Sequence, residues 1–167
     1  IFHKAEGAVI KNVGVESGMI EGGSYVGGIA GSSTGYIRSR HANGEVSGSE
    51  YVGGIAGAAS IATDCYSLVH LVGGVEKVGA ILGDTEENRR EVENPIAGNY
   101  YLAVKNDPGA IDGISYDGQA QFVREEGFFL LEGLPDQVKT GLWHCLTMFR
   151  NRRVASLSLL FSTEKKM

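Results

Sequence analysis

One heptapeptide, Tyr25-Val26-Gly27-Gly28-Ile29-Ala30-Gly31, occurs a second time without change as Tyr51-Val52-Gly53-Gly54-Ile55-Ala56-Gly57. A weaker copy follows as Lys77-Val78-Gly79-Ala80-Ile81-Leu82-Gly83. The copies begin at residues 25, 51 and 77, so their spacing is 26 residues both times. Constant length and phase of this kind indicate a repeat architecture in which each unit stacks on the next.

The 26-residue unit has the composition of strands rather than helices. Its apolar residues come in short β-branched pieces, such as Val9-Ile10 and Val13-Gly14-Val15, that are separated by glycines. Each piece can bury one face only if a neighbouring copy stacks on it, about 4.8 Å away. The sequence therefore predicts an all-β fold, a β-solenoid of the parallel β-helix type.

The phase also predicts which residues lie above one another. We expect one inward column of Val26, Val52 and Val78 and another of Ile29, Ile55 and Ile81. The same phase aligns Ile20 with Val46 and Val72, and Gly22 with Gly48 and Gly74. The repeated glycines are interpreted as corners that need positive φ, or as places where a side chain would collide with the next turn. The structural repeat comprises Tyr25, Val26, Gly27, Gly28, Ile29, Gly31, Tyr51, Val52, Gly53, Gly54, Ile55, Gly57, Val78, Gly79, Ile81 and Gly83.

These units resemble the GLUG-motif repeat, which is found in large bacterial surface and secreted proteins, including adhesin-like proteins and some immunoglobulin-A-cleaving proteases. The resemblance covers residues 1–83 well and residues 94–122 loosely. It implies a right-handed β-helix on a cell surface, and it implies no chemistry. The third unit departs from the pattern at His70 and Ala80. The matching segments are Ile10-Lys11-Asn12-Val13, Gly18-Met19-Ile20, Gly35-Tyr36-Ile37, Gly44-Glu45-Val46 and Thr63-Asp64-Cys65-Tyr66, together with the heptapeptides.

The chain is expected to hold about four turns, or rungs, within residues 1–122. The units run from about 9–34, 35–60 and 61–83, followed by a charged loop at 84–95 and a closing rung at 96–122. The loop is interpreted as a solvated connection, or as a site of contacts on the flank. Residues 123–167 lose the glycine rhythm and show apolar residues at helical spacing, which predicts a small helix-containing cap or the start of a following domain.

Composition excludes several classes of protein. The chain has 167 residues, 43% hydrophobic and 21% charged, with a net charge of −5. This balance argues against disorder and against a nucleic-acid partner, and the absence of a long apolar run argues against membrane insertion. Cys65 and Cys145 are interpreted as two unbridged thiols or as one bridge, and their spacing does not suit zinc. Because the sequence begins with Ile1, we expect a processed chain or a piece of a longer one, whose signal and anchor lie outside it.

We predict no catalytic, cofactor-binding or metal-binding residue. His3, His41, His70 and His144 have no metal-ligand spacing. Asp-Gly pairs at Asp112 and Asp117 and the Asp107-Pro108-Gly109 segment are typical of tight turns, with a shared calcium ion as the alternative. A carbohydrate-active β-helix would need clustered acids at matched positions, and these are few.

We therefore expect a non-enzymatic structural or adhesive segment of a bacterial cell-surface or secreted protein, acting as a rigid spacer or a ligand-presenting scaffold. Its expected partners are a host glycan, a host protein or neighbouring domains of the same chain. The alternative is a carbohydrate-binding or carbohydrate-active β-helix module. A surface lined by Tyr25, Tyr36 and Tyr51 would favour sugar binding.

Overall fold

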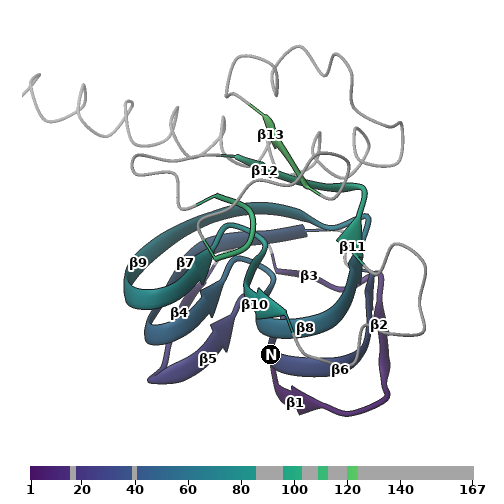
Figure 1. The fold of residues 1–167 in the computed structure, drawn as a ribbon, viewed down its shortest axis with the longest axis horizontal. Helices are drawn as coiled ribbons and strands as arrows, with labels where there is room; N and C mark the ends of the chain where they lie inside the picture. The colour runs from purple at the N-terminus through teal and green to yellow at the C-terminus, as the bar shows by residue number, and fades with distance from the viewer. Residues whose placement is uncertain (16–17, 39–40, 86–95, 103–108, 113–119, 124–167) are drawn as a thin grey trace, which may run out of the picture.

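The protein is described here by a computed structural model, which covers residues 1–15, 18–38, 41–85, 96–102, 109–112 and 120–123. Within these residues the fold is all-β, and the strands form a β-solenoid of about three turns (Figure 1). The predicted fold class is confirmed at this level. The described part contains no helix, and therefore none long and apolar enough to cross a membrane.

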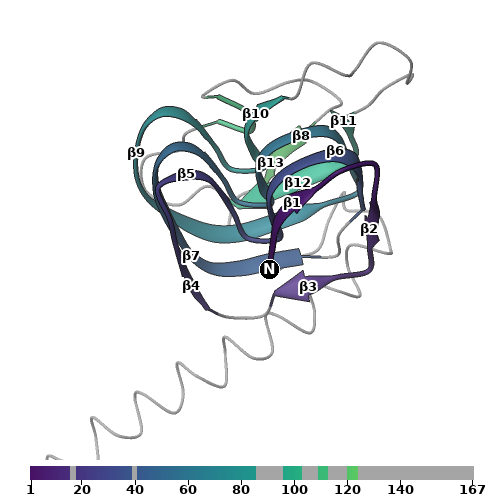
Figure 2. The ribbon, with the colours of Figure 1, turned by 90° about the horizontal axis from the view of Figure 1, so that it is seen from below.

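The strands form two sheets in which every pairing between strands is parallel. The first sheet has the order β1 (Phe2–Ala5), β6 (Ala30–Arg38), β8 (Ala56–Thr63) and β10 (Leu82–Thr85), with β2 (Val9–Lys11) on β6 and β11 (Ile96–Ala97) on β8. The second sheet has the order β13 (Ala120–Val123), β12 (Asn99–Leu102), β9 (Tyr66–Gly79), β7 (His41–Gly53) and β3 (Gly14–Val15), with β4 (Met19–Glu21) and β5 (Ser24–Gly27) also on β7. Successive turns lie over one another when the solenoid is seen from below (Figure 2).

The predicted inward columns are confirmed. Val26 pairs with Val52, and Val52 pairs with Val78. In the second column the amide nitrogen of Ile29 donates to the carbonyl oxygen of Ile55, and the amide nitrogen of Ile55 donates to the carbonyl oxygen of Ile81, each over 2.8 Å. The core therefore consists of equivalent residues from consecutive turns, and its largest fully buried side chains are Tyr66, Tyr101, Ile29, Ile37, Ile55, Ile81, Leu82, Ile96, Val46 and Val52.

The predicted register is wrong over part of the third turn. Val46 pairs with Leu71 rather than Val72, and Gly48 pairs with Gly73 rather than Gly74. The stretch of the third turn that pairs with Ser33–Tyr36 of the second turn is one residue shorter than its partner. The stretch that pairs with Gly48–Glu50 is one residue longer, which restores the register. Because side chains alternate between faces, this slip turns Leu71 toward the core and leaves Val72 39% exposed. Both shifts lie outside the heptapeptides, whose phase therefore cannot reveal them.

The repeated glycines are required by close approach of the backbone. A Cβ atom on Gly53 would overlap the carbonyl oxygen of Ala56 and lie 2.7 Å from the amide nitrogen of Gly83 in the next turn. Positive φ falls instead on the residue that opens each heptapeptide, with φ of 57° at Tyr25, 52° at Tyr51 and 57° at Lys77. Left-handed backbone costs a non-glycine residue about 1–2 kcal/mol. For the heptapeptide glycines the collision is therefore the reason observed, whereas Gly74, of the Gly22–Gly48–Gly74 set, has a positive φ of 79°.

Several predictions fall on residues outside the described ranges. These are the cap at 123–167 except Val123, most of the charged loop at 84–95, and the residues Asp107, Asp117, His144 and Cys145. Strand pairing resumes after the loop at Ile96, which pairs with Ala62.

Candidate functional site

The outer surface of the heptapeptide corner carries a stacked pair of tyrosines. The ring centroids of Tyr25 and Tyr51 are 4.3 Å apart, with an angle of 9° between the ring planes. Each tyrosine directly precedes an inward valine, so the positive φ of the tyrosine directs its side chain away from the core. Tyr25 is 41% exposed. Aromatic pairs contribute about 0.5–1.5 kcal/mol beyond the area they bury, so the stack links the first two turns at their surface.

Lys77 occupies the same position in the third turn, and we call Tyr25, Tyr51 and Lys77 the Tyr–Lys column. The Nζ atom of Lys77 lies 2.9 Å from Oδ2 of Asp112 and 3.6 Å from Oδ2 of Asp84. The hydrogen bond to Asp112, followed by the charges of Asp84 and Asp112, raises the pKa of Lys77 above its ordinary value. The surface of the column thus changes from aromatic to ionic at the third turn.

A polar column runs beside the Tyr–Lys column. The hydroxyl of Ser24 donates to Oε1 of Glu50 over 2.7 Å, and Glu50 pairs in register with Glu76. Stacked aromatic rings, of which Tyr25 is exposed and Tyr51 half-buried, beside hydroxyl and carboxylate groups have the composition of a surface that binds a polar, ring-shaped ligand. This is the strongest candidate for a binding surface among the described residues.

Tyr36 does not belong to this surface. It lies on β6 in the first sheet, where it pairs with Val9 and Ile61, and it is 46% exposed. The structure therefore brings together Tyr25 and Tyr51 and leaves Tyr36 apart.

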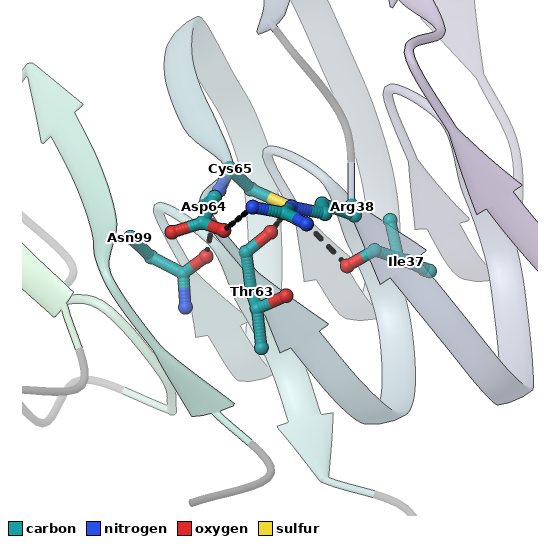
Figure 3. A network of polar contacts seen from close by, with 6 residues as sticks. All are labelled: Ile37, Arg38, Thr63, Asp64, Cys65 and Asn99. Atoms are coloured by element: carbon teal, nitrogen blue, oxygen red, sulfur yellow. Dashed lines mark hydrogen bonds and ion pairs between the residues drawn. The ribbon is translucent and has the colours of Figure 1, made fainter. Parts of the chain in front are cut away.

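The opposite corner holds a polar network that joins consecutive turns (Figure 3). Arg38 forms an ion pair of 2.8 Å with Asp64, and the thiol of Cys65 donates to the carbonyl oxygens of Thr63 and Ile37. Asn99 is fully buried, and its side chain accepts a hydrogen bond from the amide of Cys65 over 3.0 Å. The network satisfies backbone groups at the turn, so its role is structural. Sequence reasoning assigned no contact to Asn99, although Gly98 directly before Asn99 at the start of β12 is a signal for such a corner.

The described histidines and aspartates form no metal centre. His3 lies exposed on β1, and Nδ1 of His70 is 3.9 Å from Oε2 of Glu45 on the solvent-exposed surface. His41 lies on β7. The search of the described residues found no group of three His, Cys, Asp or Glu side chains that could hold a metal ion. Of the three aspartates considered for calcium, the described one, Asp112, is paired with Lys77.

Comparison with known proteins leaves the family open. No family model matches the chain, and no match was found among curated proteins or solved structures. The resemblance to the GLUG-motif repeat thus rests on the repeat residues alone.

Proposed function

We propose that this chain is a non-enzymatic structural or adhesive segment of a bacterial cell-surface or secreted protein, and that it acts as a rigid spacer or a ligand-presenting scaffold. The observation that carries the proposal is the placement of Tyr25 on Tyr51, which shows equivalent side chains of consecutive turns held directly above one another. A frame with this property presents side chains at a fixed spacing along one axis.

The backbone supports this role because it leaves little freedom between turns. The amides of Ile29 and Ile55 donate to the next turn, and the glycines of the heptapeptides have no room for a side chain. Bending the stack at this corner would break those bonds or force backbone atoms to overlap. Such a frame resists deformation in the way that a spacer or a presenting scaffold requires.

The handedness of the solenoid, its fourth rung and its cap are part of the same proposal. Right-handed winding is favoured because connections between parallel strands of one sheet are right-handed in nearly all proteins. A fourth, closing rung at 96–122 is supported by the pairing of β11 with β8 and of β12 with β9. A helix-containing cap at 123–167 would cover the strand edge that the last rung leaves. The cell-surface location is supported only by the resemblance to the GLUG-motif repeat, and we propose it on that ground.

A second candidate is a carbohydrate-binding module, which the exposed Tyr25–Tyr51 stack favours. Sugar rings bind to aromatic rings through their apolar faces, while nearby groups such as the Glu50 carboxylate accept hydrogen bonds from hydroxyls. If the chain is a carbohydrate-binding module, its partner is a host glycan, and the Tyr–Lys column is the surface that recognises this glycan.

The two candidates and the enzyme alternative can be separated with one panel of plant, host and bacterial polysaccharides. The scaffold proposal expects no depolymerisation, and it is overturned if any saccharide is cleaved at a rate that a single Asp or Glu substitution abolishes. The carbohydrate-binding candidate expects retention of a glycan that Tyr51→Ala weakens. Tyr36→Ala is the control, because Tyr36 is also a surface tyrosine, 46% exposed, but lies on the other sheet. Equal loss in both variants would contradict binding at the stack.

A further inference from the structure

Residues 109–112 lie on the corner of the third turn. The amides of Ile81 and Leu82 donate to the carbonyl oxygen of Ala110 over 2.9 and 3.2 Å, and the amide of Ala80 donates to that of Gly109 over 2.7 Å. Ala110 is fully buried and Ile111 is 2% exposed, so this short segment covers the end of the Ile29–Ile55–Ile81 column.

Lys77 provides the side-chain connection between this segment and the third turn. Its Nζ atom donates to Asp112 in the segment and lies 3.6 Å from Asp84 on β10. In the two turns below, the equivalent positions hold Tyr25 and Tyr51, which contact each other through their rings. The third heptapeptide departs from the first two at this position, where residues 109–112 place a carboxylate beside it.

We propose that Lys77 forms an ionic latch with Asp84 and Asp112, and that this latch holds residues 109–112 on the third turn. Loss of the latch makes opening of the segment more frequent while the turns below stay paired, because those turns are joined along both sheets. The inference goes beyond the proposed function, since a scaffold needs no segment that opens separately.

The raised pKa of Lys77 agrees with this arrangement, because it shows that the surrounding carboxylates favour the charged form. The side chains of Lys77, Asp84 and Asp112 are 36%, 30% and 38% exposed, so salt screens their attraction. The latch is therefore weak enough to open in solution, and its strength depends on ionic strength.

Amide hydrogen exchange measures directly how often the latch opens. The amides of Ala80, Ile81 and Leu82 donate to residues 109–110, and they become exchangeable when the segment opens. The equivalent amides one turn below, Gly54, Ile55 and Ala56, donate to the third turn and serve as an internal reference. Opening of the latch exposes the first set and leaves the second set protected.

The test compares the full chain with Asp112→Asn and with Lys77→Tyr, which restores the tyrosine of the other two copies. We expect exchange at residues 80–82 to rise roughly two- to fivefold in both variants, with residues 54–56 unchanged. In the unsubstituted chain, 1 M salt should produce the same rise, and it should add nothing in the variants. Glu76→Gln, next to Lys77 on the same strand, is the control and should have no effect.

The proposal is overturned if Asp112→Asn leaves the exchange of residues 80–82 unchanged, or if residues 54–56 accelerate by the same factor, which would mean general destabilisation. Because Asp112 is a partly exposed side chain, its replacement by the near-isosteric Asn keeps the backbone intact and decides the question even if Lys77→Tyr does not fold.

Discussion

Asn99 and Ala62 are 37 residues apart, yet the side-chain amide nitrogen of Asn99 donates to the carbonyl oxygen of Ala62 over 2.8 Å. The oxygen of the same amide accepts from the backbone of Cys65, so a single buried side chain satisfies both a donor and an acceptor of the turn below. Backbone groups that leave a strand at a corner have no partner in the sheet, and burial without a partner is costly. Asn99 thus fixes the position of the chain where pairing resumes after residues 86–95.

Replacing Asn99 with Ala should destabilise the fold by about 1–3 kcal/mol, because the amide of Cys65 and the carbonyl of Ala62 both lose their partner. Unfolding in urea measures the loss. Gln121→Ala is the control, since Gln121 is exposed and pairs with Tyr100, the neighbour of Asn99. We expect the control to stay within about 0.5 kcal/mol of the unsubstituted chain. Similar losses in the two variants would show that Asn99 has no special role.

Gly53 and Gly23 offer a matched pair for the effect of a side chain on the turn. Gly53→Ala should be severely destabilising, by about 3 kcal/mol or more, because the new methyl group would overlap the carbonyl oxygen of Ala56. At Gly23 an added Cβ meets nothing within 4 Å and φ is not in the positive range, so Ala there should be neutral or stabilising by up to about 1 kcal/mol. Thermal melts of the two variants provide the comparison, and equal melting temperatures would contradict the close-approach explanation.

The pKa of Lys77 predicts the alkaline behaviour of the latch. A group whose pKa is raised in the folded state stabilises that state below its unfolded pKa, and this contribution is lost as pH rises through the folded pKa. The hydrogen bond to Asp112 and the charges of Asp84 and Asp112 raise the pKa of Lys77 above 10.5. The stability difference between the unsubstituted chain and Lys77→Gln should therefore hold at neutral pH and vanish in strongly alkaline solution. A difference that persists there would have a cause other than the lysine charge.

The repeat made the inward columns predictable, because a constant phase fixes which residues meet when identical units stack. Val26 over Val52 and Ile29 over Ile55 follow from that phase alone. The register near Leu71 could not be predicted in this way, because two shifts of one residue that compensate each other leave the spacing of the heptapeptides unchanged. The ionic partners of Lys77 and the buried contacts of Asn99 depend on segments that carry no copy of the repeat, so the 26-residue phase could not place them.

The two compensating shifts in the third turn have a consequence for how an array of this kind can change in length. The third turn loses one residue opposite the segment after Ser33 and regains it opposite the segment before Glu50. The heptapeptide that follows is again in phase with the one below. The alignment of these two turns is therefore restored before their heptapeptides begin. A deletion or an inserted loop in one arc remains a local event, and the turns stacked beyond it keep their positions.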